Sequence, residues 1–277
     1  MTTRTQLVYI STAGRTSGTP GDFRCVIPDG MVKAYAGETM AVRVRDLSMK
    51  RSWNTISPVN NSFWLLQDGL TTAISLPVGT YSVTALADFL ALLLPGVSVS
   101  FDPTTSRLHF TSSTTFGFEF SDPSLLKSAA ALMGFAQGDA PSGTAFSSTG
   151  CVDVTGDYAV FVRSNLQKPR GAALDNMSGA FAASDVLLKV PIEVPAFGTI
   201  VWEGLNDDCS EIAGDAINEL HVSVTDDVNN PIAVTQDWSL TLEFAFSKPA
   251  PDLHRVLQDI RGYSRDTFML TGLQQTG

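Results

Sequence analysis

The sequence contains few of the side chains from which metal centres and nucleophilic active sites are built. Among its 277 residues there are three cysteines and three histidines. The cysteines, Cys25, Cys151 and Cys209, are far apart and have neither the Cys-x-x-Cys nor the Cys/His spacing that surrounds zinc. We therefore expect them to be buried thiols of a protein made in a reducing compartment, and we expect no metal site.

Recognisable catalytic motifs are also absent. The sequence has no Gly-x-Ser-x-Gly elbow, no Gly-x-Gly-x-x-Gly loop and no Walker pattern. The histidines fall in a predicted hairpin (His109), a predicted strand (His221) and a predicted C-terminal helix (His254). His221, in "NELHVSV", occupies a polar-facing strand position, which favours a structural histidine over a catalytic one. We expect neither enzymatic activity nor a bound cofactor.

Positive charge is scarce. Lys and Arg number 18 against 28 Asp and Glu, so the formal net charge is −10 at pH 7, and a chain this acidic is not expected to bind nucleic acid in a sequence-specific way. The excess of acids lies downstream of residue 51, because residues 1–51 hold eight Lys/Arg and four acids. We interpret this basic segment as a solvated face. A contact with an acidic partner, either nucleic acid or the acidic body of a neighbouring copy, is the alternative.

Long hydrophobic runs are missing as well. The longest, residues 85–97, is shorter than the roughly 20 apolar residues that cross a bilayer, and it contains Asp88. The first residues, "MTTRTQLVYIST", lack the apolar centre of a signal peptide. We expect no transmembrane segment and no secretory signal.

What the sequence does contain is a series of strand patterns. In "ETMAVRVRDLSM", apolar residues at Met40, Val42 and Val44 alternate with polar ones, and Leu47 follows. Turn segments such as "PDG", "FGT" and "DDVNNP" separate the strand candidates. Spaced strands with long irregular connections and few helices predict a mainly β fold, a jelly roll or another β-sandwich. The further candidates are "YAVFVRS", "DVLLKVPIEV", "GTIVWEG", "NELHVSVTDD" and "DWSLTLEFAF".

One region interrupts the strand patterns with two helices around a hairpin. The first helix is predicted to begin after the N-cap candidate Ser82 and to end at Pro95, and the second to run from the N-cap candidate Asp122 to Gly134. Between them, "GVSVSF" and "RLHFTS" form a hairpin around the turn "DPTTS". The apolar stripe of the first helix is Val83, Leu86, Leu90 and Leu93.

These elements predict how the chain is divided. The helix, hairpin and helix can cover their own apolar stripe, so we expect them to form a lobe inserted into the sandwich. The predicted parts are an N-terminal arm (1–21), a jelly-roll sandwich (22–76 with 150–247), an inserted α+β lobe (77–149) and a C-terminal helical arm (248–277).

Several segments also occur in a recognisable order between Asp22 and Phe246. They are "GDFRCVIPDGMVKAYAGETMAVRVRDLSMKRSWNTI", "ISLPVGTYSVTALADFLALL", "VSFDPTTSRLHF", "LMGF", "YAVFVRSNL", "DVLLKVPI" and "NPIAVTQDWSLTLEFAF". In this order they resemble the minor jelly-roll capsid proteins, or penton proteins, of polinton-like elements, adintoviruses and large eukaryotic double-stranded DNA viruses. The sequence departs from that family between Asn165 and Asp185 and after the last strand.

The resemblance implies a function, partners and a location. It implies a virion structural protein in an icosahedral capsid, made in the host cytoplasm or nucleus. Its implied partners are the major capsid protein and other capsid subunits, including its own copies in a homo-oligomer, which is a pentamer if the protein sits at the vertex.

The C-terminal segment has an apolar face that needs a partner. Pro249 and Pro251 prevent further strand pairing, and Leu253 begins a helical repeat that Gly262 ends. A helix of twelve residues, about 18 Å long, is too short to be stable alone in water. We predict an arm that docks on a neighbouring capsid subunit, with folding back onto its own sandwich as the alternative. The candidate contact residues of this arm are Leu253, Val256, Leu257, Ile260, Tyr263, Phe268, Met269 and Leu270.

A binding module for a glycan or a host receptor is the alternative function, because jelly rolls also serve as lectins. Trp202 and Trp238 lie in apolar strands and are expected in the core. Trp53 and Trp64 flank the loop "NTISPVNN" and are candidates for a partner or glycan contact.

An acidic segment, "NDDCSEIAGD", offers carboxylate ligands for calcium. It lacks the Asp-x-Asp-x-Asp-Gly loop that arranges such ligands around one ion, so we favour a solvated loop. Its acids are Asp207, Asp208, Glu211 and Asp215.

Overall fold

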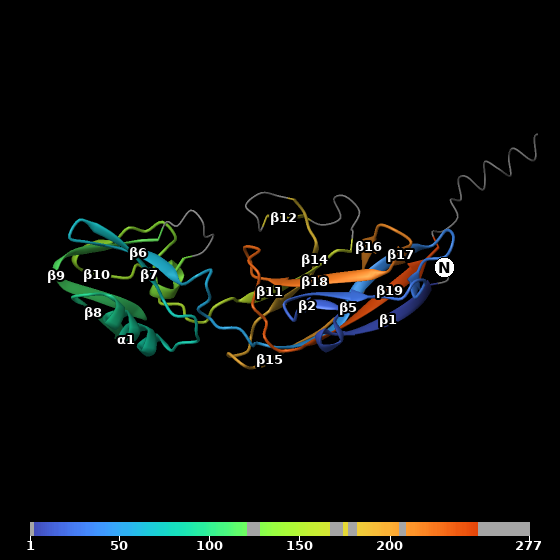
Figure 1. Cartoon of the computed structure of the whole chain (residues 1–277), viewed down its shortest axis with the longest axis horizontal. Coiled ribbons are helices and arrows are strands. Elements are labelled where there is room, and N and C mark those ends of the chain that lie inside the picture. The colour runs from blue at the N-terminus through green and yellow to red at the C-terminus, as the bar shows by residue number, and fades with distance from the viewer. Residues whose placement is uncertain (1–2, 121–127, 167–173, 177–181, 205–208, 249–277) are drawn as a thin grey trace, which may run out of the picture.

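A computed structural model shows an elongated molecule with a small lobe at one end and a larger β-sandwich beside it (Figure 1). The structure describes residues 3–120, 128–166, 174–176, 182–204 and 209–248. The N-terminal end lies on the side of the sandwich that is far from the lobe. Among the described residues, no helix is both long enough and apolar enough to cross a membrane.

One sheet of the sandwich has the antiparallel order β1-β19-β5-β15, and β16 pairs with another part of β5. β19 is therefore a central strand, hydrogen-bonded to β1 on one side and to β5 on the other. β1 is an edge strand, because no strand in the described part of the chain pairs with its outer side. These strands are β1 (Thr3–Ser11), β5 (Thr39–Lys50), β15 (Thr199–Glu203), β16 (Ser210–Ile212) and β19 (Ser239–Ser247).

The second sheet has the antiparallel order β14-β11-β18-β3-β2. Its strands are β2 (Ser17–Thr19), β3 (Asp22–Val26), β11 (Ala159–Ser164), β14 (Val186–Pro191) and β18 (Glu219–Thr225). Two short pairs and one turn of 3₁₀ helix complete this part of the molecule: β4 (Val32–Lys33) with β17 (Ala216–Ile217), β12 (Leu174–Asp175) with β13 (Ala182–Ala183), and η1 (Thr12–Gly14).

The strand order is that of a jelly roll. Along the chain the main sandwich strands are β1, β3, β5, β11, β14, β15, β18 and β19. The first, eighth, third and sixth of them form one sheet, and the second, seventh, fourth and fifth form the other. Two Greek keys wrapped around each other produce this order. The predicted mainly β jelly roll with an inserted α+β lobe is confirmed, and the predicted C-terminal helix lies outside the described residues.

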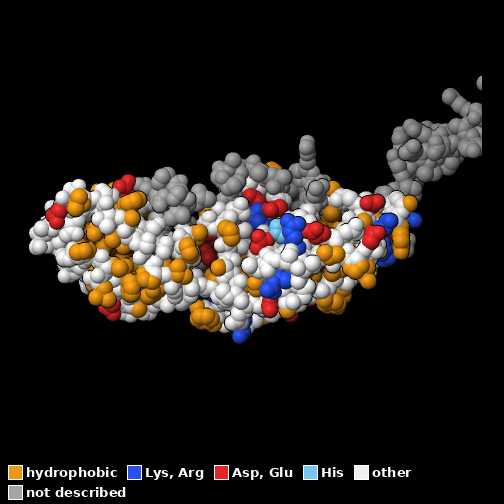
Figure 2. Space-filling model, in the orientation of Figure 1, with side chains coloured by type: hydrophobic (Ala, Val, Ile, Leu, Met, Phe, Trp, Pro, Cys, Tyr) orange, Lys and Arg blue, Asp and Glu red, His pale blue; other side chains and the backbone are white. Residues whose placement is uncertain are grey.

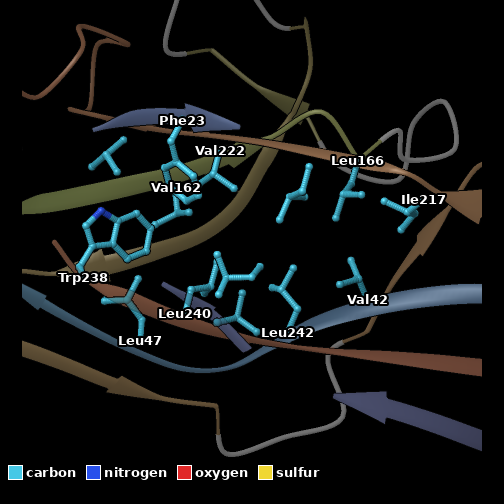
Figure 3. Close-up of a cluster of buried hydrophobic side chains, with 14 of the residues drawn as sticks. Phe23, Val42, Leu47, Val162, Leu166, Ile217, Val222, Trp238, Leu240 and Leu242 are labelled. Carbon is cyan, nitrogen blue, oxygen red and sulfur yellow. The ribbon is translucent and has the colours of Figure 1, made fainter. Parts of the chain in front are cut away.

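A hydrophobic core fills the space between the two sheets (Figure 3). Figure 3 shows Trp238, Leu47 and Leu240 pointing toward Phe23 and Val162 of the opposite sheet. Trp238 is only 4% exposed, and its indole Nε1 donates a hydrogen bond to the carbonyl of Pro20 at 2.7 Å. Its ring meets that of Phe23 edge-on, with 5.7 Å between the centroids. The expectation that Trp238 belongs to the core is confirmed.

A β-bulge in β5 explains an irregularity in the apolar pattern. Val44 and Leu47 both face the core although they are three positions apart, which in a regular strand would place them on opposite faces. The pairing register between β5 and β19 shifts at this point and leaves Arg45 without a residue opposite it. The extra residue shifts the alternation of inward-facing and outward-facing side chains by one position, so Leu47 faces the core.

The predicted N-terminal arm is wrong for residues 3–11, which form β1 and pair with β19 along their whole length. Val8 and Ile10 turn inward, so the segment contributes to the core as an ordinary strand. Its beginning is also fixed by Arg4. The Arg4 guanidinium lies 3.8 Å from the centre of the Phe246 ring and 3.3 Å from a carboxylate oxygen of Glu38.

The lobe has its own sheet, in the order β10-β9-β6-β7, with β8 paired to β9. Because β6 and β7 belong to this sheet, the predicted start of the lobe at residue 77 is too late. Its hydrophobic cluster already includes Ile56, and Val154 packs against the same cluster. The elements are β6 (Ser62–Gln67), β7 (Leu70–Ser75), α1 (Val83–Leu93), β8 (Val97–Asp102), β9 (Arg107–Glu119), α2 (Ala130–Met133) and β10 (Ser142–Ser147).

The core of the lobe is built from α1 and a group of phenylalanines. Ser82 caps α1 as predicted, because its Oγ accepts a hydrogen bond from the backbone N–H of Ala85 at 3.2 Å. Leu86 and Leu90 are buried on the inner face of this helix. The predicted second helix ends at Gly134 as expected, but its predicted N-cap lies outside the described residues. The phenylalanines are Phe63, Phe110, Phe116, Phe118, Phe120 and Phe135.

Candidate functional site

A groove of about 640 Å³ runs along the edge strand β1. One side is formed by residues 6–11 of β1, and the other by the end of β3 and the loop that follows it. The floor consists of side chains that also belong to the sandwich core, so the rigid part of the fold holds the groove open. These buried residues are Ile10, Ile27, Val32 and Leu220.

The rim of the groove is both apolar and exposed. Tyr9 is 77% exposed, Val26 63%, Met31 60% and Leu7 47%. The side-chain amide of Gln6 donates a hydrogen bond to the carbonyl of Met31 at 2.8 Å, which ties the loop to β1. Exposed large hydrophobic side chains gathered in one place mark an interaction surface.

No described side chain that lines the groove is charged, although 17% of the chain is charged. Elsewhere on the sandwich, acidic and basic side chains gather on the face shown in Figure 2. On the sandwich, Arg24 pairs with Glu219, and the ring of His221 lies 2.5 Å from a carboxylate oxygen of Asp22. The groove therefore suits an apolar protein segment, and it offers no counter-charge for an ionic ligand.

Two of the three histidines, His109 and His221, lie in the described part of the chain, and His109 has a serine and an aspartate near it. Its Nδ1 is 2.6 Å from the hydroxyl of Ser147, and its Nε2 is 3.9 Å from a carboxylate oxygen of Asp102. The second distance is too long for a hydrogen bond. Hydrogen bonds from the Thr105 hydroxyl and the Thr104 N–H hold the pKa of Asp102 below its ordinary value, so this carboxylate caps its own turn. The geometry is that of cross-strand surface contacts. His254 lies outside the described residues.

A cluster of three carboxylates that sequence reasoning missed lies where the lobe joins the sandwich. Oxygen atoms of Asp157, Asp226 and Asp227 are within 4.8 Å of one another. Asp226 is buried and accepts hydrogen bonds from the backbone N–H groups of Val228 and Asn230, at 2.9 and 2.8 Å. Its carboxylate therefore shapes the turn after β18. The cluster combines residues from two distant segments, and no local spacing in the sequence reveals it.

The buried guanidinium of Arg51 lies beside this cluster. It donates hydrogen bonds to the carbonyl of Val194 at 2.9 Å and to the carbonyl of Thr155. Burial lowers the pKa of Arg51, and the charge of Asp157 acts in the opposite direction. Arg51 therefore links the strand that leads into the lobe with the segment that leaves it.

This chain has no match in sequence and a likeness in fold among known proteins. No protein-family model and no curated protein matches this chain in sequence. Among solved structures, the chain is similar to the mavirus penton protein, whose crystal structure was determined from selenomethionine-labelled protein. The two are 11% identical, with a TM-score of 0.48, and the match covers 89% of this chain and 100% of the mavirus chain.

The tryptophans proposed as contact residues have different positions. Trp53 is only 5% exposed and belongs to the sandwich core, so its interpretation as a surface contact is wrong. The neighbouring Ser52 accepts hydrogen bonds from the N–H groups of Thr235 and Gln236 at its hydroxyl, a long-range contact that sequence periodicity does not reveal. Trp64 is half-buried in β6 of the lobe, opposite Ala73 of β7 and Glu119 of β9. The candidate residues 253–270 lie outside the described residues.

The cysteines are less buried than expected. Cys151 and Cys209 are exposed and Cys25 is half-buried. Cys151 lies in an irregular connection and Cys209 precedes a short strand, so neither side chain faces a core. Cys25 lines the groove beside β1, and partial burial raises the pKa of its thiol.

The acidic segment considered for calcium is only partly described. Glu211 lies in β16 opposite Ala41 of β5, and the carbonyl of Asp215 accepts a hydrogen bond from the N–H of Ala34 at 2.7 Å. Asp207 and Asp208 lie outside the described residues. The interpretation of this segment as a solvated loop is wrong for residues 210–212, which pair with β5 as the strand β16 and bury Ile212.

Proposed function

We propose that this protein is a structural subunit of an icosahedral double-stranded DNA virus shell, a penton or another minor capsid protein. The observation that carries the proposal is the jelly-roll strand order with an α+β lobe inserted between its third and fourth strands, β5 and β11. The segments that resemble penton proteins occupy fixed places in this fold. "RVRDLS" lies in the bulged strand β5, "PVGTY" precedes α1, and "DWSLTLEFAF" covers all of the central strand β19 except its last residue.

The surface of the described residues supports a role in packing against other proteins. Its most exposed large side chains include Tyr9, Val26 and Met31 around one uncharged groove. When a protein partner covers such a surface, each Å² of apolar area removed from water stabilises the complex by about 25 cal/mol. The proposed partners are the major capsid protein and further copies of this chain. These copies form a pentamer if the protein occupies the five-fold vertex of the shell.

Coexpression of the full-length chain with the major capsid protein of the same virus tests the proposal. The expected result is a particle in which cryo-electron microscopy finds this chain at the five-fold vertices or at another minor position. Light scattering of the chain alone gives its copy number. A full-length chain that stays outside the particles, remains monomeric and binds an immobilised sugar would instead identify a glycan-binding module.

A further inference from the structure

We propose that the groove along β1 binds the C-terminal arm, residues 249–277, of a second copy of this chain. This inference rests on the proposed shell function and identifies both the surface that receives the arm and the partner that supplies it. It follows from the chemistry of the groove, from its dimensions and from the direction in which the chain leaves β19.

The arm and the groove match in chemistry. The groove has a buried apolar floor, an exposed apolar rim and no charged lining residue among those described. The arm presents an apolar stripe in a segment too short to be stable as an isolated helix. Both surfaces lose unfavourable contact with water when the stripe lies in the groove. The stripe consists of Leu253, Val256, Leu257 and Ile260.

The arm and the groove also match in length. Residues 253–260 span about 12 Å as a helix. The lining residues of β1, from Gln6 to Ser11, span about 17 Å as a strand. About two turns of amphipathic helix therefore fit along the groove, with the apolar stripe against its floor.

The direction of the chain favours the groove of another copy. β19 runs antiparallel to β1, so it passes Ser11 first and ends with Ser247 opposite Thr3. The chain therefore leaves the sheet heading away from the groove, which lies beside residues 6–11. The next residues are "KPAP", in which each proline holds the preceding residue in an extended conformation. A segment restricted in this way is expected to continue in the direction of β19, away from its own groove.

An exchange of arms between copies has a consequence for assembly. Every copy carries one arm and one groove, and these are different surfaces. A contact between different surfaces is heterologous, and its repetition closes a ring when the rotation between neighbouring copies divides a full turn. A single type of contact is then enough to hold every pair of neighbours in the proposed homo-oligomer.

Photo-crosslinking of the full-length protein tests the inference. Unlabelled copies carry p-benzoylphenylalanine in place of Leu257 and are mixed with ¹⁵N-labelled copies of the natural sequence. After irradiation at high protein concentration, mass spectrometry is expected to find the p-benzoylphenylalanine at position 257 of the unlabelled copy joined to peptides containing residues 6–11 or 25–31 of the labelled copy. Crosslinks only within one chain, or between copies only at other surfaces, would overturn the inference.

Substitutions in the groove provide the second measurement. Met31→Asp places a charge on the exposed rim, where it leaves the core intact, and is expected to lower the yield of crosslinks between copies about tenfold. Leu92→Asp is the matched control, because Leu92 is 82% exposed on α1 of the lobe, and it should leave the yield unchanged. Equal yields for both variants would also refute the groove as the binding site.

This test is separate from the test of the shell function. It uses isolated protein and gives a result whether or not the chain enters particles. Incorporation into particles without crosslinks in the groove would leave the shell function standing and remove the arm exchange. Crosslinks in the groove without incorporation into particles would support the arm exchange and argue against the shell function.

Discussion

Removal of the lobe should leave the sandwich folded. The chain enters the lobe after Thr55 and leaves it before Gly156, and a Cβ added to Gly156 would lie 3.2 Å from the Cα of Thr55. These two points are therefore adjacent, and a Gly/Ser linker of about four residues can replace residues 56–155 without stretching the chain. The separate hydrophobic clusters of the lobe and the sandwich give the physical reason why each can fold by itself.

The expected magnitudes follow from what the deletion removes. About 100 residues no longer unfold, so the heat capacity change of unfolding should fall by about 1.2–1.5 kcal/mol/K. The buried Arg51 loses the carbonyl of Thr155 as a hydrogen-bond acceptor. A buried donor left without a partner costs about 1–3 kcal/mol, so the free energy of unfolding of the sandwich should fall by about that amount. Arg51→Met in the shortened chain should recover part of this loss.

Differential scanning calorimetry of the full-length and shortened chains measures both quantities. The shortened chain should unfold in one cooperative transition that matches a transition of the full-length protein after correction for the Arg51 effect. Loss of any cooperative transition in the shortened chain, with retained strand signal by circular dichroism, would show that the two clusters form a single folding unit and that the proposed division is wrong.

Three further predictions concern particular side chains. Leu90→Ala empties a fully buried position of α1 and should cost about 2–5 kcal/mol in chemical denaturation, whereas the exposed Leu92→Ala should cost less than about 0.5. The lowered pKa of Asp102 stabilises the fold above the ordinary carboxyl pKa, and this contribution is lost as the pH falls through the lowered value. Asp102→Asn should therefore lower the melting temperature at neutral pH and weaken its fall in acid; identical acid profiles would contradict this. Chelators should leave the melting temperature unchanged, and a clear drop would indicate a calcium site, for which Asp226→Asn is the first substitution to examine.

The local features that the sequence predicted are those set by neighbouring residues. Ser82 caps α1 because its hydroxyl reaches the N–H three positions later, and Gly134 ends α2 because its φ of 77° suits glycine. The jelly roll was predictable because the spacing of strands and turns limits how a mainly β chain can bury its apolar faces.

The errors occur where distant contacts decide the outcome. The predicted arm is wrong for residues 3–11 because the buried side of this segment depends on pairing with β19, more than 200 residues away. Leu47 and Val44 do not fit one alternation of buried and exposed side chains, and only the bulge at Arg45 explains why both are buried. The groove beside β1 joins residues 6–11 with the loop after β3 and with Leu220, so no single segment of the sequence reveals it.

The central position of β19 determines how the molecule bears a mechanical load. The arm continues directly from this strand, so tension applied to the arm along the strand axis acts on the ladders to β1 and β5 at the same time. Hydrogen bonds perpendicular to the pull are loaded together in shear, and they resist it collectively. At the end of the strand, Arg4 stacks on Phe246 and adds a further attachment where the tension enters the sheet. A pull across the sheet would load the same bonds one after another, so the anchorage of the arm is strongest along one direction.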